Sequence, residues 1–242
     1  MSGHSKWSKI KHKKEANDAQ KGKSFSKLSK EISLAVKEGG GGDVNFNYQL
    51  RSVVDRAKFA KMPLSSIENA IAKGLGSGKD GTLERILYEG YFSGGVALLI
   101  ECLTDNKNRT VAELRMALRK NGAELSSSGS VLWQFNRVGE IKIININTTD
   151  EKFEKLLDII GVVDIEEFDE GLTITSQPDK VQKVREEIEK LGIEVVSAGL
   201  VYKSKEGVEV NDKDSFIKLI DEIEDLDDVL NVWHNAILED RE

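Results

Sequence analysis

The 242-residue sequence contains one cysteine, two prolines, three histidines and no long hydrophobic run. A single cysteine cannot form an intramolecular disulfide, so an oxidising compartment offers this chain no benefit. Cys102 lies inside the apolar run 96–103, which predicts a small buried thiol rather than a nucleophile. No apolar stretch is long enough to cross a bilayer, and none follows the basic residues 1–14 as it would in a secretory signal. These absences predict a cytoplasmic protein without membrane contact.

The sequence also lacks the motifs of metal, nucleotide and catalytic sites. His4, His12 and His234 form no H-E-x-x-H pair and have no cysteine partner, so no zinc site is expected. The acidic run 221–228 lacks calcium-loop spacing. The glycine-rich segment 74–81 fails the phosphate-loop pattern and indicates a linker. We therefore expect no enzyme, no cofactor and no small-molecule substrate. The alternative left open is an enzyme whose residues meet only on folding, between α+β domains.

Charge is distributed very unevenly along the chain. Residues 1–79 hold 16 Lys/Arg and 7 Asp/Glu, a net charge of +9, whereas residues 80–242 hold 19 and 35, a net charge of −16. Such asymmetry is typical of a part that faces nucleic acid attached to an acidic body. The alternative is that the charges of both parts only keep their surfaces solvated. It fits less well because nine lysines fall within the first 30 residues.

Residues 1–79 predict a basic helical domain. After a basic arm over 1–22, apolar residues spaced by three and four predict a helix from about Ser24 to Glu38, with lysines on the opposite face. A second helix is expected to end before Met62, and a third to open with a Ser65–Glu68 capping box. Three short helices with short connections form a small bundle.

After residue 80 the pattern favours strands. Residues 86–92 and 96–104 predict a hairpin, Thr110 and Glu113 predict a capping box that opens a helix, and 130–135 predicts a further strand. Residues 137–205 predict the order βαββαβ of a ferredoxin-like sandwich. A helix around 216–223 and a strand over 229–237 would complete the first unit after this insertion.

The predicted fold class is therefore α+β: an N-terminal three-helix domain followed by two ferredoxin-like α+β domains, one inserted in the other. The expected domains are 1–79 (basic, helical, nucleic-acid-binding), 80–136 plus 206–242 (discontinuous α+β) and 137–205 (inserted, ferredoxin-like).

The basic arm and first helix are the predicted nucleic-acid surface. Lysines attract backbone phosphates by charge, and an aromatic or histidine ring between them can stack on a base. The arm has no arginine, so it suits backbone and shape more than base sequence. The predicted nucleic-acid-binding residues are Lys6, Trp7, Lys9, Lys11, His12, Lys13, Lys14, Lys21, Lys23, Lys27 and Lys30.

Several motifs resemble the YebC/PmpR family, which includes the mitochondrial translational activator of cytochrome oxidase. They are Gly3-His4-Ser5-Lys6-Trp7, Ala60-Lys61-Met62-Pro63, Tyr88-Glu89-Gly90-Tyr91, Glu101 to Asn106, Asn108 to Glu113, and Asp225 to Val229. The resemblance spans the chain and implies three domains, the third inserted in the second, and a cytoplasmic regulator with no catalytic residue to carry over. The turn at 41–46 departs from the proline-containing turn of many members.

Two functions remain open on this reading. The first is a DNA-binding transcriptional regulator, favoured by the basic region and by the family's usual description. The second is an RNA-binding, ribosome-associated translation factor that relieves stalling, for example at proline runs. The lysine-rich arm with Trp7 and His12 suits structured RNA, and the acidic body suits basic ribosomal proteins.

Overall fold

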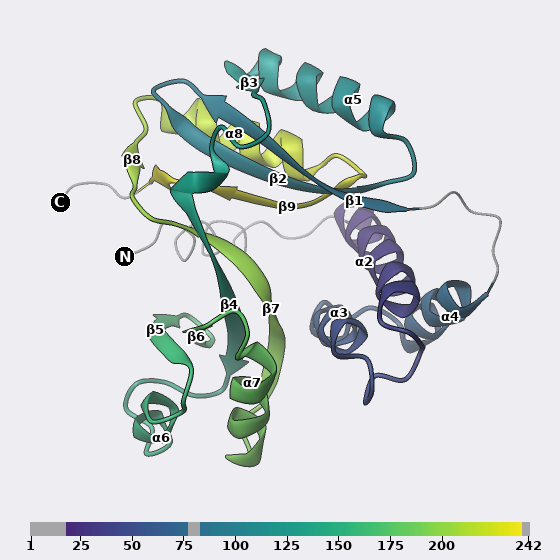
Figure 1. Ribbon diagram of the computed structural model, residues 1–242, viewed down its shortest axis with the longest axis vertical. Coiled ribbons are helices and arrows are strands. Elements are labelled where there is room, and N and C mark those ends of the chain that lie inside the picture. Colours follow the sequence, from purple (N-terminus) through teal and green to yellow (C-terminus); the bar gives the residue numbers. More distant parts are fainter. Residues whose placement is uncertain (1–17, 77–82, 239–242) are drawn as a thin grey trace. The chain divides into compact units, whose positions relative to one another are not determined.

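The computed structural model describes residues 18–76 and 83–238 (Figure 1). Within this part the chain forms two compact units. One contains a four-stranded sheet in the order β3-β1-β2-β9, and the other contains helices α3 and α4 and a four-stranded sheet in the order β5-β6-β4-β7. The division falls after Lys27, inside helix α2.

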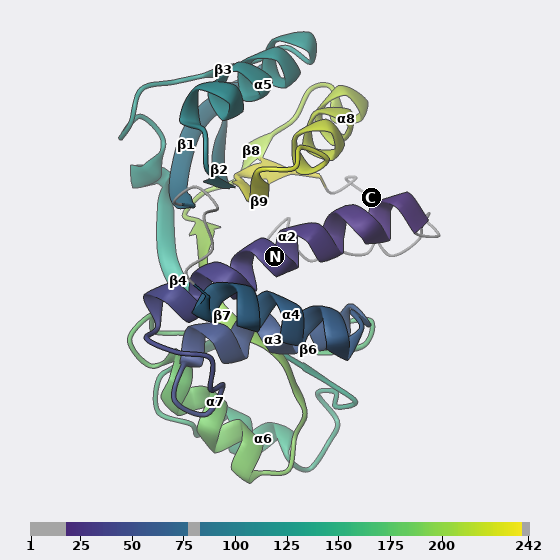
Figure 2. The same cartoon turned by 90° about the vertical axis from the view of Figure 1, so that its right-hand side faces the viewer.

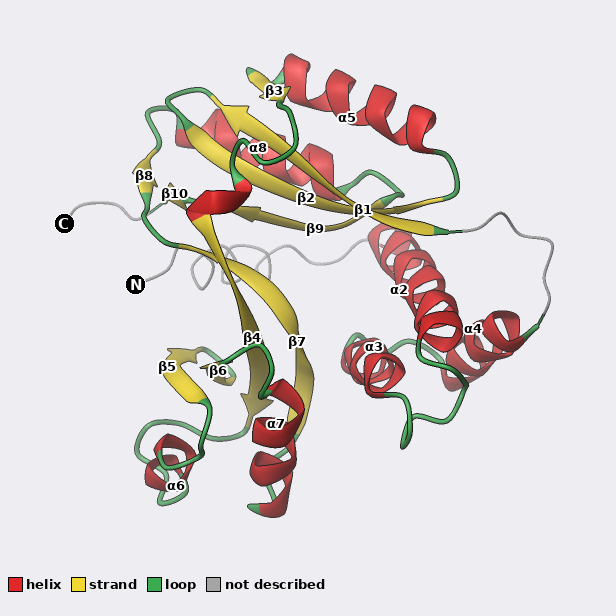
Figure 3. Ribbon diagram, viewed as in Figure 1, coloured by secondary structure: helices red, strands yellow, loops and turns green. Residues whose placement is uncertain are grey.

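The first sheet is built from segments on both sides of the inserted residues. Strands β1 and β2 form an antiparallel hairpin in which Phe92 pairs with Val96, and Gly94 and Gly95 supply the positive φ angles of its turn. The elements are β1 (Glu84–Phe92), β2 (Val96–Thr104), α5 (Lys107–Lys120), β3 (Ala123–Leu125), α8 (Lys213–Glu224) and β9 (Val229–His234), with the short parallel pair β8 (Val208–Glu209) and β10 (Ala236–Ile237). The colouring of Figure 3 separates these strands from the helices.

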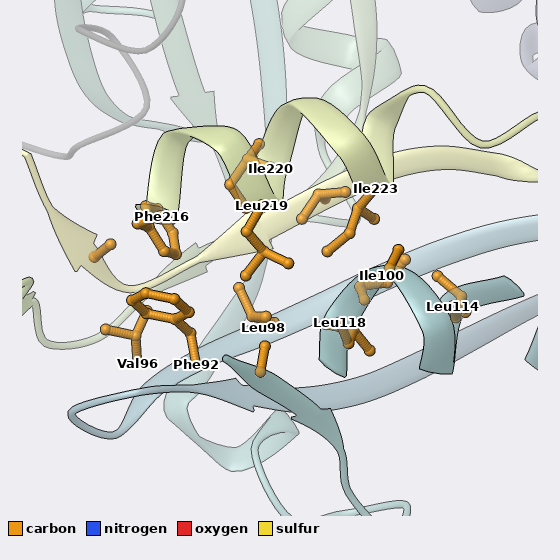
Figure 4. Packing of buried hydrophobic residues seen from close by; sticks show 14 of the residues in the cluster. Phe92, Val96, Leu98, Ile100, Leu114, Leu118, Phe216, Leu219, Ile220 and Ile223 are labelled. Atoms are coloured by element: carbon orange, nitrogen blue, oxygen red, sulfur yellow. The ribbon is translucent and has the colours of Figure 1, made fainter. Parts of the chain in front are cut away.

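Helices α5 and α8 lie side by side on one face of this sheet (Figure 2). Leu98 and Ile100 of β2 are fully buried beneath them, with Leu118 of α5 and Phe216 of α8 (Figure 4). The rings of Phe92 and Phe216 meet edge to face with centroids 5.2 Å apart. Each such buried side chain contributes about 1.5–3 kcal/mol, so this layer is the main source of stability of the unit.

Three helices precede the sheets: α2 (Asp18–Glu38), α3 (Tyr48–Phe59) and α4 (Leu64–Leu75). The side chain of Asn47 caps α3 by accepting from the amide of Leu50 at 3.0 Å, and it donates to the carbonyl of Ala35 at 2.8 Å. The inward face predicted for α2 is confirmed, because Leu28, Ile32 and Val36 are buried.

The second sheet and its helices form the predicted ferredoxin-like unit. Ile141, Ile143, Ile174, Val184 and Ile188 are fully buried in its core. The strand order β5-β6-β4-β7 is that of a ferredoxin-like sandwich, and the predicted α+β fold class is confirmed. Its elements are β4 (Phe135–Ile144), α6 (Phe153–Leu157), β5 (Val162–Phe168), β6 (Gly171–Ser176), α7 (Val181–Lys190) and β7 (Val195–Ser204).

A charged cluster joins α3 to α7 within the second unit. The guanidinium of Arg185, almost fully buried, bonds to Asp55 and lies 3.0 Å from Glu189. The Nη2 atom of Arg51 donates to both carboxylate oxygens of Glu189, at 2.7 and 2.6 Å. Burial acts to raise the pKa of Glu189, but the two arginines outweigh it and lower the pKa. The helical segment and the ferredoxin-like segment therefore share a contact, although the predicted domain boundaries stay a prediction.

Both predicted capping boxes are wrong. Helix α4 begins after Pro63 with no side-chain cap, so Ser65 lies inside its first turn. Helix α5 begins after Asn106, whose side chain accepts from the amide of Arg109 at 3.2 Å. Thr110 instead faces inward and is buried. An S/T-x-x-E match fixes a helix start only when no better cap precedes it, and Asn106 is such a cap.

The strand expected over 130–135 is also wrong. The chain there forms a turn and the short 3₁₀ helix η1 (Leu132–Gln134), and β4 begins at Phe135. The physical reason is a carboxylate from another strand: Glu89 accepts the amide hydrogens of Gly129, Val131 and Leu132. These bonds take the amides that a strand would pair with its neighbour.

Candidate nucleic-acid interface

The predicted nucleic-acid residues divide into two groups. Most lie outside the described residues: Lys6, Trp7, Lys9, Lys11, His12, Lys13 and Lys14. The other four lie on α2, where Lys21 and Lys23 are exposed and Lys27 and Lys30 are half-buried. The described part of the chain therefore brings four of the predicted lysines onto one helix.

Two of these lysines bind the C-terminal end of α8. The Nζ atom of Lys23 lies 3.2 Å from a carboxylate oxygen of Asp225, and the Nζ atom of Lys27 donates to the carbonyl of Glu224. A cation is stabilised at a helix C-terminus by the unpaired carbonyls and the helix dipole. Lys23 and Lys27 thus have a structural role that the sequence did not indicate, and a phosphate would compete with Asp225 for Lys23.

A second basic surface lies on α5, which sequence analysis missed. The helix carries Lys107, Arg109, Arg115, Arg119 and Lys120 against Glu113 alone, a net charge of +4 in the acidic part of the chain. Three of the five are paired: Lys107 with Glu84, Arg109 with Asp105 and Asp228, and Lys120 with Glu222.

Arg115 and Arg119 are the other two cations of α5, and both are exposed. Neither is paired with a carboxylate among residues 18–76 and 83–238. They stand one helical turn apart, with Met116, 70% exposed, beside them. Arginine binds phosphate with two parallel hydrogen bonds, so this outer face suits an anionic backbone. The signal that could have found it is the positive charge of one helix within an acidic segment.

The start of α5 is held by a buried carboxylate. Asp228, 3% exposed, accepts from Thr104 at 3.0 Å, from Thr110 at 2.8 Å and from the guanidinium of Arg109 at 2.9 Å. The backbone carbonyl of Asp228 also accepts from the amide of Leu103 at 2.7 Å. These bonds fix the orientation of α5, and with it the direction in which Arg115 and Arg119 point.

Cys102 is confirmed as a buried thiol. Burial, followed by the negative charges of Asp228 and Glu101, raises its pKa to about 12, and Lys27 offsets this only in part. A thiol with this pKa stays protonated at neutral pH and is a poor nucleophile. No group of three or more His, Cys, Asp or Glu side chains within the described ranges could hold a metal ion.

These features define a class before they define a family: an α+β protein with an N-terminal helical region and arginines on an open helix face, suited to an anionic macromolecule. The sequence matches the TACO1/YebC protein N-terminal domain over residues 5–77 and the TACO1/YebC second and third domain over residues 83–236. The chain belongs to the TACO1/YebC family, as the resemblance predicted.

The similarity to named relatives extends over nearly the whole chain. It is 44% identical to a probable transcriptional regulatory protein of Thermoanaerobacter pseudethanolicus, over 99% of this chain and 98% of the relative. It is also 44% identical to one of Caldanaerobacter subterraneus, over 99% of this chain and 100% of the relative. The crystal structure of a conserved hypothetical protein from Aquifex aeolicus matches with a TM-score of 0.83 at 37% identity, covering 94% of this chain and 95% of that one. Among residues 18–76 and 83–238, no helix combines the length and the apolar composition that a membrane span requires.

Proposed function

We propose that this protein is a non-enzymatic regulator of gene expression that works in the cytoplasm by binding nucleic acid. The observation that carries the proposal is the separation of charge: a strongly basic start and the arginine face of α5, within a chain of net charge −7. Release of counterions from phosphates would drive binding at such surfaces, while the acidic remainder limits non-specific coating of nucleic acid. The raised pKa of the Cys102 thiol supports a role without nucleophilic catalysis.

Transcriptional regulation by DNA binding is the first form of this proposal. Relatives 44% identical over the whole chain carry the name of probable transcriptional regulatory proteins. Arg115 and Arg119 add the kind of side chain that reads guanine as well as phosphate, which the N-terminal arm lacks.

Translation is the second form, in which the protein binds RNA on the ribosome. The specific observation in its favour is the lysine-rich arm with Trp7 and His12, which offers charge and stacking but few base-reading donors. Proteins recognise structured RNA by shape, phosphate contacts and stacking on unpaired bases.

Sedimentation of the full-length protein in DNase-treated lysate at physiological salt separates the two forms. The comparison variant changes Lys9, Lys11, Lys13 and Lys14 together to Glu. Migration with ribosomes that this variant loses, with thermal stability nearly unchanged, would favour translation. A protein that stays at the top of the gradient but shifts a DNA fragment in a gel at the same salt would favour transcription. Wild-type protein that binds neither ribosomes nor DNA would refute both forms.

A further inference from the structure

The segment 126–134, between β3 and β4, is an ordered loop that we call the tryptophan loop. Its anchor is Glu89 of β1, 5% exposed, whose carboxylate accepts the amide hydrogens of Gly129 at 2.6 Å, Val131 at 2.7 Å and Leu132 at 2.9 Å. The carbonyl of Glu89 also accepts from the amide of Ser126 at 2.8 Å. One buried side chain thus sets the backbone path of a surface loop. Breaking these hydrogen bonds would cost free energy, because the buried carboxylate would lose its donors.

This loop presents Trp133 to solvent. The side chain is 67% exposed, although tryptophan is highly buried on average. Its indole Nε1 donates to the carbonyl of Ser130 at 2.8 Å, and the hydroxyl of Tyr91 donates to the same carbonyl at 2.8 Å. The indole is therefore held at a fixed angle with its ring still open to solvent, a preorganised state that reduces the entropy lost on binding.

A positive charge lies at the backbone carbonyl of the same residue. The Nζ atom of Lys205 donates to the carbonyl of Trp133 at 2.6 Å. The backbone amide of Lys205 donates to the carbonyl of Gln134 at 2.9 Å. Lys205 is exposed and has no carboxylate partner within the described ranges. A lysine ammonium has three donors, so it can bind Trp133 and a phosphate oxygen together.

We propose that Trp133 and Lys205 form a subsite for one nucleotide of single-stranded nucleic acid, with the base stacked on the indole and its phosphate at the ammonium. The proposal rests on the proposed function and names what this surface would bind. Aromatic faces beside a basic side chain bind single strands in this way without reading sequence.

The hydrogen bonding of the indole favours a base over a protein partner. A tryptophan at a protein interface commonly offers its N–H to the partner, because one end of the ring is polar. Here Ser130 already takes that hydrogen, so the ring offers its π face alone. In a base-paired duplex every base is already stacked, so the subsite should prefer unpaired strands.

The test measures binding of fluorescein-labelled 12-mers of polyuridine, polythymidine and a DNA duplex to the full-length protein at constant salt. Trp133→Ala should weaken binding of both single strands by about 5- to 150-fold, the range for loss of one stacking aromatic, and leave the duplex almost unchanged. Trp133→Phe should keep binding within about threefold, since the phenyl ring still stacks.

In a Trp7→Phe background, unlabelled polyuridine should quench tryptophan fluorescence, and this quenching should vanish with Trp133→Ala because Trp233 is buried.

Leu157→Ala is the control, because Leu157 is 56% exposed on α6, away from the tryptophan loop in sequence and structure unit. Unchanged single-strand affinity in Trp133→Ala, with loss in the four-lysine variant, would overturn the subsite and leave the proposed function standing. Loss of ribosome co-sedimentation in Trp133→Ala with unchanged oligonucleotide affinity would overturn it in favour of a protein partner. Wild-type protein that binds none of the probes would overturn the subsite, and the proposed function would then be decided by the sedimentation and gel-shift measurements.

Discussion

The hydroxyl of Thr110 lies 2.8 Å from a carboxylate oxygen of Asp228, 118 residues further along the chain. The same oxygen accepts from Thr104 and Arg109, so one carboxylate joins the end of β2 and the first turn of α5 to the turn before β9. A buried carboxylate with several donors is stable only while those donors stay in place, which makes this junction sensitive to single substitutions.

Asp228→Ala should lower the free energy of unfolding by about 3 kcal/mol, because it removes a buried acceptor and leaves Thr104 and Thr110 without it. Urea denaturation followed by circular dichroism measures the change. The control Asp158→Ala, at an exposed aspartate, should change stability by about 0.5 kcal/mol or less. Equal effects of the two substitutions would show that the Asp228 junction does not stabilise the fold.

Arg115→Glu with Arg119→Glu should weaken nucleic-acid binding roughly tenfold at 50 mM salt and reduce the slope of log K against log salt by about 2, one unit for each lost phosphate contact. Fluorescence anisotropy over a salt series gives both values. The matched control is Lys155→Glu with Lys183→Glu, two exposed lysines on α6 and α7 whose reversal changes the net charge equally. If both pairs lower affinity alike, overall charge rather than the α5 face accounts for the effect.

The Cys102 thiol should resist Ellman's reagent at pH 8 and react only as fast as the protein unfolds, since it is fully buried and its pKa is raised to about 12. The pKa of this thiol is therefore higher in the folded protein than in the unfolded chain, where it is near 8.5. The contribution of the protonated thiol to the free energy of unfolding is complete below about pH 8.5. Above that pH the contribution falls by about 1.4 kcal/mol for each pH unit. Cys102→Ala should flatten this alkaline decline in the unfolding free energy. Rapid labelling of folded protein would contradict the buried thiol.

Glu89 should make the tryptophan loop sensitive to acid. Burial acts to raise the pKa of this carboxyl, but the amides of Gly129, Val131 and Leu132 outweigh it and hold the pKa below its usual value. With the folded pKa depressed, the stabilisation is present above the ordinary glutamate pKa of about 4.3 and is lost as pH falls through the folded value. The Tm difference between wild type and Glu89→Gln should therefore shrink as the pH drops below about 4. A difference independent of pH would show that the charge of Glu89 does not hold the loop.

Elements with strong periodicity were predictable from the sequence, and their reason is local. The inward residues of α2, the hairpin turn at Gly94 and Gly95, and the strand order of the inserted unit follow from apolar spacing and turn chemistry. Cys102 was predicted to be buried because apolar residues surround it in the sequence.

The two capping boxes failed for local reasons, at the helix starts themselves, whereas the strand expected over 130–135 failed because a residue distant in sequence decides the local structure. The loop at 129–132 is set by Glu89, 40 to 43 positions earlier, and no pattern within the loop reveals that carboxylate. The contact of Lys23 with Asp225, 202 positions later, could not be seen in the charge pattern either, and the role of Lys23 toward nucleic acid stays a prediction. The arginine face of α5 was overlooked because a net negative segment conceals one positive helix.

The core beneath α5 has a consequence for synthesis on the ribosome. Strand β2 emerges early, but Phe216 of α8 and the pairing strand β9 follow only after the inserted unit. The insert holds its own four strands and both of its helices within residues 135–204, so it can fold first. The domain that contains β1 and β2 therefore completes its folding after the insert. Until α8 has been synthesised, Leu98 and Ile100 are not fully buried. A chain truncated at residue 205 should therefore aggregate through an unfinished sheet beside a folded insert.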